Sequence, residues 1–379
     1  MSVGEGMTAP ALPLYGDSLG ASYKQLGFLM TGYSVAYALM TVIAGKVSDH
    51  IGRKGILLIS IFLSIVASTG YFLSATPVVL LMFRTLEGAS RGILWPISEA
   101  IVADNTTSSV RDKAMGRFTA AYGAGVTLGT LLGGYVTQYI SLTAVFPVYP
   151  ILGIIVFATS LLGITEASPD EQCHGKALGK LDVANFKREI KKIWPLCYVG
   201  FAYAGFLYSL WALLSKVADS FGVSSVNIGV IFALFWGSRM IAFMLCGNIA
   251  AVLGRKRVLV FGVLLCALSA GTLLTAQNFT LLAMAAACGG AGTGLTFPLS
   301  ITLVSNQASP AYRGFAIGFL EFCMGIGMIT QTALSGIIGE AGGVQSTYLF
   351  TFAVIMVAIP IALFFIHDEA ALDTFPSNQ

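Results

Sequence analysis

The chain repeats itself at a fixed offset of 202 residues. The segment GKVSDHIGRK (45–54) returns as GNIAAVLGRK (247–256), and the register then holds without a gap over a long span. Glycine frees the backbone and proline restricts it, so their joint recurrence predicts two copies of one fold. The recurring pairs are Asp17 with Asp219, Gly20 with Gly222, Gly27 with Gly229, Gly88 with Gly290, Pro96 with Pro298, Arg111 with Arg313, Gly116 with Gly318 and Gly125 with Gly327.

Both copies are too apolar for a water-soluble domain. Hydrophobic residues make up 56% of the 379 and charged residues only 10%, whereas soluble domains carry about 25% charged residues. The mean hydropathy is +0.82. Apolar runs long enough to cross a bilayer as helices follow one another with short interruptions. We expect membrane helices over about 25–46, 55–75, 77–101, 115–138, 144–164, 194–216, 227–249, 257–276, 278–304, 314–338 and 346–366.

The positive charges predict which side of the membrane each loop faces, because cytoplasmic loops are rich in Lys and Arg. If the loop around Arg53 is cytoplasmic, 16 of the 21 Lys and Arg fall on that side and only Lys24 and Lys216 on the other. The polar segment between the two copies and the C-terminus then lie in the cytoplasm, and we expect the cell membrane of a prokaryote. The remaining three cations lie inside apolar runs, at Arg84, Arg91 and Arg239.

The domain division follows the repeat, with a first transmembrane bundle over 1–164, a linker over 165–192 and a second bundle over 193–379. The basic second part of the linker suits a helix on the membrane surface, or equally a flank that holds the next helix at the interface. Only about 14 residues precede Tyr15, where the repeat requires a whole membrane helix. We therefore expect a truncated first helix, either because the true start lies upstream or because its beginning is lost. The fold class is an all-α polytopic membrane protein with two pseudo-repeated six-helix bundles.

The repeated segment fits the pattern G-x-x-x-D-x-x-G-R-K. In it, Asp49 can stabilise the positive end of a neighbouring helix, while Arg53 and Lys54 can pair with acids. The segment resembles the loop between helices 2 and 3 of the major facilitator superfamily. The second copy has Ala251 in place of the acid, which predicts a weaker second gate, and the cations could instead be only positive-inside anchors. The predicted gating residues are Gly45, Asp49, Gly52, Arg53, Lys54, Gly254, Arg255 and Lys256.

Three further segments resemble the drug and sugar efflux branch of that superfamily. They are APALPLY (9–15) at the end of helix 1, RTLEG (84–88) in helix 4, and a glycine pattern in helix 5 that is similar to the signature of proton-linked antiporters. Thr130 stands where that signature has proline, a departure that bears on antiport and not on transport. The resemblance implies a transporter whose halves rock about a central substrate site. The helix 5 glycines, expected to serve helix packing, are Gly125, Gly129, Gly133 and Gly134.

Charges inside the bilayer are candidates for function, because burying them is costly. Arg84, Glu87 and Arg91 are spaced three and four residues apart, so they share one helix face with Trp95 and Ser98. Glu87 can neutralise one arginine, which leaves about one positive charge facing the cavity. The resemblance makes Arg84 a proton-coupling or structural arginine. The alternative is an ionic ladder that satisfies itself and holds helix 4 to a neighbour.

Two more intramembrane charges break the repeat, since Arg239 and Glu321 correspond to Tyr37 and Thr119 in the first copy. Charges added asymmetrically to a duplicated scaffold suggest function. The two could pair with each other or serve separately, Glu321 as proton acceptor and Arg239 as substrate anchor. Glu5, near the start of the chain, is a third candidate for substrate or proton binding.

At the cytoplasmic end of helix 4, Glu99 and Asp104 can reach the loop that carries Arg53, and we expect them to act as a latch. Arg111 and its repeat counterpart Arg313 complete the predicted set of latch partners.

The leading interpretation is a secondary transporter for proton-coupled efflux of an amphipathic compound or a sugar, acting as a monomer in the lipid bilayer. No Walker loop, zinc-type Cys/His spacing or nucleophile–base pair occurs, so neither enzyme activity nor a metal, cofactor or nucleic-acid partner is expected. Two alternatives stay open. One is a transport-inactive sensor or scaffold, which the truncated first helix and weaker second gate favour. The other is an uptake symporter for sugars or organic acids.

Overall fold

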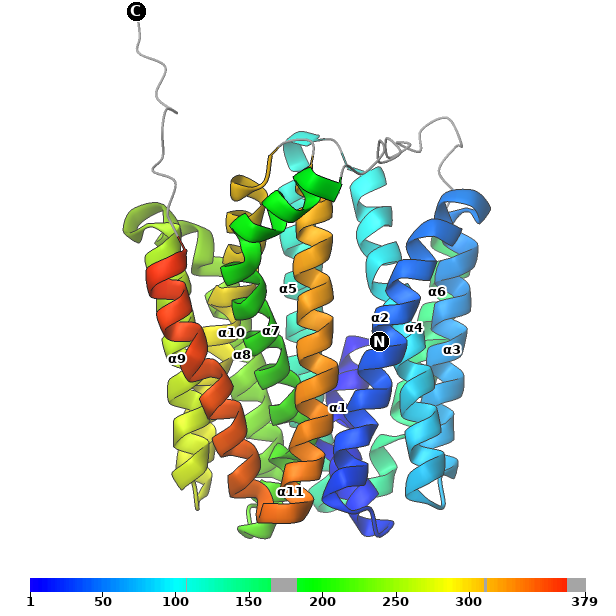
Figure 1. Ribbon diagram of the computed structural model, residues 1–379. Coiled ribbons are helices and arrows are strands. Elements are labelled where there is room, and N and C mark those ends of the chain that lie inside the picture. Colours follow the sequence, from blue (N-terminus) through cyan, green and yellow to red (C-terminus); the bar gives the residue numbers. More distant parts are fainter. Residues whose placement is uncertain (107, 165–182, 310–311, 367–379) are drawn as a thin grey trace, which may run out of the picture.

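The computed structural model describes residues 1–106, 108–164, 183–309 and 312–366, and every regular element within these ranges is a helix (Figure 1). At 45–51, 103–104, 108–113, 183–189 and 313–314 it describes the backbone alone. The first half contains α1 (Ser2–Ser18), α2 (Tyr23–Ile51), α3 (Arg53–Leu73), α4 (Pro77–Asp104), α5 (Ser108–Tyr139), η1 (Leu142–Val145) and α6 (Val148–Gly163). The second half contains α7 (Val183–Ser220), α8 (Ser225–Leu253), α9 (Arg255–Thr275), α10 (Phe279–Gln307) and α11 (Arg313–Phe365).

The last helix, α11, is two helices joined at a kink. Gly343 has φ 77° and ψ 172° and interrupts the helical backbone. The two arms run in opposite directions and meet at this residue (Figure 1). When the arms are counted separately, the described residues form six helices in each half, which confirms the predicted pair of six-helix bundles. The predicted span 144–164 begins later than expected, because residues 142–145 form a 3-10 turn and Pro147 caps α6.

The backbone of the turns confirms the repeat. Gly20 (φ 84°) corresponds to Gly222 (φ 71°), and Gly52 (φ 94°) corresponds to Gly254 (φ 88°). Each of these residues adopts a positive φ that side chains disfavour, so glycine recurs for a structural reason. The first pair also closes the same turn, since the Gly20 and Gly222 amides each donate to the carbonyl three residues earlier at 2.8 Å.

The two halves lie side by side, blue to cyan in one and green to red in the other (Figure 1). One end of the bundle carries the ends of α6 and α11 and the start of α7, and we call it the linker end. Gly20, Gly222 and Gly343 mark the opposite end, which we call the far end. Within α7, the basic residues before Ile193 continue into the membrane helix without a break, although its first turns run across the linker end (Figure 1).

Eight helices of the described residues are long and apolar enough to cross a membrane. The long helix α4 is not among them, because Arg84, Glu87 and Arg91 fall within eight residues of one another. Short α1 is not among them either, at 17 residues against the 38 of its repeat counterpart α7. Helix α5 is not among them either. Of the described helices, the three without a clear membrane signal, α1, α4 and α5, all lie in the first half, and α1 and α4 carry its buried charges.

The halves touch at the far end and separate toward the linker end. Along α5 and α8, a Cβ added to Gly134 would lie 3.0 Å from the Cα of Gly229. About three turns closer to the linker end, a Cβ at Gly123 would meet the Met240 side chain at 3.4 Å. About two turns closer still, a Cβ at Gly116 would meet nothing within 4 Å. These two helices are therefore in backbone contact at the far end, whereas Gly116, nearer the linker end, faces open space.

A second pair of helices between the halves, α2 and α11, behaves in the same way. A Cβ added to Gly27 would lie 2.7 Å from the Cα of Gly336. Nearer the linker end, a Cβ at Gly325 would lie 3.9 Å from the Ala38 Cβ, and one at Gly318 would meet nothing within 4 Å. Two independent helix pairs thus describe one wedge-shaped gap that opens at the linker end.

Candidate functional site

The face of α4 that carries charge is buried. Arg84 and Arg91 are each 5% exposed and Glu87 is fully buried. Arg84 forms an ion pair with Glu87, and the Tyr71 hydroxyl of α3 donates a hydrogen bond to the same carboxylate oxygen. The guanidinium of Arg84 also lies over the Tyr33 ring, 4.4 Å from its centroid. Because every partner lies within the first half, this cluster fixes α2, α3 and α4 to one another.

The second arginine of α4 is neutralised by α1. Arg91 forms an ion pair with Glu5, and the Tyr122 hydroxyl of α5 donates to Glu5 Oε2 at 3.1 Å. Glu5 is 7% exposed, so the pair is buried. The four charges sum to zero. The expectation that one positive charge is left over on α4 is therefore wrong, because Glu5 of the neighbouring helix α1 neutralises Arg91.

Aromatic rings form a continuous arc across the boundary between the halves. We use the name aromatic arc for six residues in contact order, with ring centroids 4.9–6.4 Å apart: Tyr33, Tyr208, Trp211, Trp236, Tyr122 and Trp95. The arc begins on α2, passes through α7 and α8 of the second half, and returns to α5 and α4. Offset and edge-to-face contacts at these distances are favourable, so the arc ties the halves together near mid-membrane.

Arg239 lies at the same arc but has no acidic partner. Its guanidinium stands over the Trp236 ring, 5.2 Å from the centroid, and donates to the Tyr203 hydroxyl at 3.1 Å. No carboxylate of the described residues lies within ion-pairing distance of it, so it does not pair with Glu321. The side chain is partly exposed. Of the two arrangements left open by the sequence, the structure has Arg239 and Glu321 apart.

Two carboxyl groups face the gap nearer the linker end. Glu321 of α11 is exposed and Glu99 of α4 is partly exposed. They come from different halves, yet they are close enough to interact electrostatically. Trp95, one turn before Glu99, packs on Phe118 with ring centroids 5.4 Å apart. Glu99 therefore has a second-half neighbour of the same sign, a contact that the predicted latch did not include.

The predicted gating loops are described only in part. Gly52 and Gly254 precede α3 and α9 with positive φ, and Arg53 and Arg255 are the first residues of those helices. The side chains of Asp49, Asp104, Arg111 and Arg313 lie outside the described residues, as does that of any other residue at 45–51, so their gating and latching roles stay predictions.

The glycines of α5 face two different helices. A Cβ on Gly125, Gly129 or Gly133 would collide with α1, at 2.0–2.6 Å from Ser2 Oγ, the Val3 carbonyl and the Met7 carbonyl. Gly134 faces α8 instead, with the Ser225 carbonyl 2.6 Å from its added Cβ. The pattern therefore allows α5 to contact α1 within its own half and α8 in the other half at backbone distance.

Polar contacts close the far end between the halves. Asp17 of α1 pairs with Lys216 of α7, whose ammonium also lies 4.3 Å from the centroid of the Tyr23 ring. Around this pair are further links between helices of opposite halves, namely Glu340 with the Lys24 amide (3.1 Å), Gln138 with the Ser225 amide (3.0 Å) and Thr31 with Thr332 (3.0 Å). These contacts form a seal between the halves at the far end.

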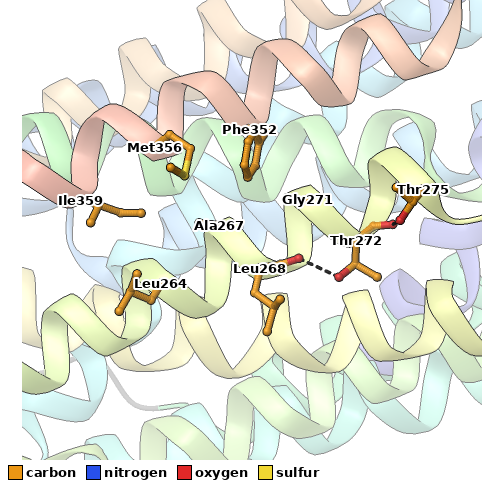
Figure 2. Close-up of a pocket in the computed structure, with 9 residues that line it drawn as sticks. All are labelled: Leu264, Ala267, Leu268, Gly271, Thr272, Thr275, Phe352, Met356 and Ile359. Carbon is orange, nitrogen blue, oxygen red and sulfur yellow. Dashed lines mark hydrogen bonds between the residues drawn. The ribbon is translucent and has the colours of Figure 1, made fainter.

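A groove of about 440 Å³ lies elsewhere, between α9 and the second arm of α11 (Figure 2). Its walls are mostly aliphatic and aromatic, with Leu268 and Met356 exposed on the outer face of the bundle. It holds none of the charged residues above. We assign it to the lipid-facing surface and not to the site. In the described part of the chain, no group of three or more metal-ligating side chains occurs.

Sequence reasoning missed Tyr71, Tyr122, Trp211 and Trp236. None of them has a motif or a spacing that marks it, because each acts through a contact with another helix. The one available signal was composition, since aromatic residues make up 11% of the chain and tryptophan is rare enough, at four residues, to examine one by one.

The comparison with protein families decides the identity of the fold. A family model described as Major Facilitator Superfamily matches residues 1–215 and, a second time, residues 196–379. The chain belongs to the major facilitator superfamily. The two matches correspond to the two copies of the repeat.

Individual members of the superfamily align along the chain. Multidrug resistance protein 2 of Bacillus subtilis (strain 168) is 23% identical over 386 residues, covering 99% of this chain and 94% of that protein. The quinolone resistance protein NorA of Staphylococcus aureus is 26% identical over 235 residues, covering 60% of this chain and 58% of that protein. The crystal structure of the nucleoside transporter NupG superposes with a TM-score of 0.81 at 14% identity and covers 96% of both chains. The chain is therefore an integral membrane transporter of this superfamily, with relatives among multidrug resistance proteins.

Proposed function

We propose that this member of the superfamily exports an amphipathic compound in exchange for protons, by alternating access. The observation that carries the proposal is the wedge-shaped gap, which is sealed at the far end and leaves Arg239 and Glu321 accessible from the linker end. Such a gap is one of the two states that alternating access requires.

The positive charges suggest the orientation. Since 16 of the 21 Lys and Arg fall on the side of the Arg53 loop, the linker end is the cytoplasmic end. The described conformation then faces inward, with the Asp17–Lys216 pair on the outside. A contact made in only one state stabilises that state. The far-end seal therefore favours the inward-facing form, and the predicted loop contacts would favour the other.

Export is the direction that the relatives support. One relative is named as a multidrug resistance protein and another as a quinolone resistance protein. A transporter confers resistance by removing the drug from the cell. Proton coupling is supported by Glu321, an intramembrane carboxyl group with no repeat counterpart and no ion-pair partner among the described residues. A carboxyl group at the rim of the gap can change protonation as the gap opens and closes.

The test is transport by protein reconstituted in inside-out vesicles, with ethidium and 2-naphthylacetate as cationic and anionic probes. We expect an inside-acid gradient to drive uptake of at least one probe. Glu321→Gln should abolish the dependence on the gradient but retain probe exchange at equal pH, because only the coupling proton is lost. Asp219→Asn, which removes an exposed carboxyl group at the far end, is the matched control and should behave as wild type.

Each other outcome overturns a part of the proposal. Gradient dependence that survives in Glu321→Gln removes that residue from coupling. Flux in the opposite direction identifies an uptake symporter. No flux of any probe by folded protein favours the transport-inactive sensor or scaffold.

A further inference from the structure

The arginine in the membrane interior of the second half, Arg239, has no acidic partner among the described residues. Of the three arginines that lie inside apolar runs, Arg84 and Arg91 have carboxylate partners, and Arg239 has none among the described residues. A guanidinium stays protonated in a protein and offers five N–H donors, of which the Tyr203 hydroxyl accepts one. The Trp236 ring also stabilises the positive charge, but no carboxylate of the described residues neutralises it.

Three other donor groups are linked to this arginine: Tyr203 and Trp236 contact it directly, and Trp211 packs on Trp236. The indole nitrogens of Trp211 and Trp236 are buried, and neither has a hydrogen-bond partner among the described residues. Each tryptophan is 8% exposed. The Tyr203 hydroxyl accepts from Arg239, which leaves its own proton to donate. We call Arg239, Tyr203, Trp211 and Trp236 the donor cluster. Buried N–H groups without an acceptor are costly and uncommon, so four donor groups together indicate a missing acceptor.

The donor cluster is also aromatic and lies where the halves meet. Trp211 and Trp236 are neighbours in the aromatic arc, at 5.1 Å between centroids, and Tyr203 contacts Phe297 at 6.2 Å. Trp236 contacts Tyr122 of the first half, and the residue after Arg239, Met240, lies 3.4 Å from where a Cβ on Gly123 would be. A ligand here would contact both halves, and its apolar part would lie against rings.

We propose that the donor cluster binds the anionic group of the transported compound, and that the substrate class is therefore an aromatic organic anion with a carboxylate or sulfonate. The acid group accepts from Arg239 and the indoles, and the ring system stacks in the aromatic arc. Charge-assisted hydrogen bonds to a guanidinium are stronger than neutral ones, which makes the anion the preferred charge state. This proposal rests on the proposed transport function for its physiological meaning, but the binding itself can be tested without transport.

The experiment is calorimetric binding to the full chain in detergent micelles, with three probes that share one ring system. The probes are 2-naphthylacetate, 2-naphthaleneethanol and 2-naphthylethylammonium, and heats from empty micelles are subtracted. We expect the anion to bind roughly tenfold or more tightly than the alcohol, since one charge-assisted hydrogen bond supplies that ratio. The ammonium should bind most weakly.

Variants then locate the preference. Arg239→Gln should remove the advantage of the anion over the alcohol while leaving the affinity for the alcohol within about twofold, which also reports that the protein is folded. Arg239→Lys should keep part of the advantage. Trp211→Phe retains the ring but loses the donor, and should weaken anion binding about threefold to tenfold. Lys191→Gln, which removes an exposed cation of α7 at the linker end, is the matched control and should change nothing.

Several outcomes would overturn the proposal. An equal loss of alcohol and anion binding in Arg239→Gln would assign Arg239 a structural role. Tightest binding of the ammonium, or an anion preference that survives in Arg239→Gln, would refute the donor cluster as the anion site. A charge preference without flux in vesicles overturns the proposed function and leaves the site standing, whereas flux without a charge preference overturns the site alone.

Discussion

In the first half of the molecule, Arg84 and Arg91 each meet a carboxylate of the same half, whereas Arg239 in the second half meets a tyrosine hydroxyl and the face of a tryptophan. The two halves share one backbone plan, as the positive-φ glycines at equivalent turns demonstrate. Their charges nevertheless differ in kind. The first half holds two closed ion pairs, and the second half holds charges that are open to the gap.

The difference teaches how a duplicated transporter can divide its labour. Closed buried pairs hold helices in place, because removing one partner leaves an uncompensated charge. Open charges cost stability but can exchange partners with a substrate or a proton. On this basis we propose that the first half is the rigid frame and that the second half binds the substrate and the proton. The predictions below test that division, from the largest expected effect to the smallest.

The first prediction compares the loss of an arginine in each half. Arg91→Gln leaves Glu5 buried without its cation and should lower the free energy of unfolding by about 3–5 kcal/mol. Arg239→Gln removes no ion pair and should cost less than about 1.5 kcal/mol, the net value of a typical hydrogen bond. Denaturant titration in detergent micelles measures both.

A double variant separates charge from shape at the first-half site. Glu5→Gln combined with Arg91→Gln removes both charges, so much of the stability lost in Arg91→Gln should return. Equal destabilisation by Arg91→Gln and Arg239→Gln would contradict the division into frame and chemistry.

The second prediction compares two tyrosine hydroxyls. Tyr71 is fully buried and donates to Glu87, so Tyr71→Phe should cost about 1–3 kcal/mol of unfolding free energy. Tyr203→Phe removes only the acceptor for a partly exposed Arg239 and should cost about 1 kcal/mol or less. The same titration is the measurement, with Tyr135→Phe, an exposed tyrosine of α5, as the control that should not change. A larger loss for Tyr203→Phe would reverse the comparison.

The third prediction concerns the pair that joins the halves. Asp17 is 39% exposed at its side chain, so its pair with Lys216 should contribute only about 0–1 kcal/mol to stability. A double-mutant cycle with Asp17→Asn and Lys216→Gln gives that coupling free energy. In transport, the same variants should lower the population with a closed far end, seen as faster labelling of a cysteine placed at Ala21. A coupling free energy larger than the loss caused by Arg91→Gln would mean that the far-end seal, and not the buried first-half ion pairs, contributes most to stability.

The fold was largely predictable from the sequence. The apolar runs and the recurring glycines can be read directly from the sequence, and both determine backbone conformation. The recurring glycines Gly52 and Gly254, for example, both adopt a positive φ. The predicted helix over 144–164 began too early, because residues 144–147 are apolar although they form a turn. The separation of α11 into two arms was also predicted, since turn residues interrupt its apolar pattern.

The site was predictable only where spacing along one helix carries the information. The shared face of Arg84, Glu87 and Arg91 follows from their three- and four-residue intervals. The pairing of Arg91 with Glu5 does not, because it joins residues 86 positions apart across two helices. The donor cluster is even harder to predict from the sequence. Its members come from α7 and α8, and its defining property, the absence of an acceptor, exists only once the helices are packed.

The glycine contacts at the far end have a mechanical consequence. Where Gly134 meets Gly229 and Gly27 meets Gly336, backbone touches backbone, with no side chain that must change rotamer when the helices tilt. Each contact can therefore serve as a fulcrum. About 27 Å of helix separates Gly134 from Gly116 at 1.5 Å per residue, so a tilt of about 10° would move the linker end by about 5 Å. A lever of that length converts a small rotation at the seal into the opening or closing of the whole gap.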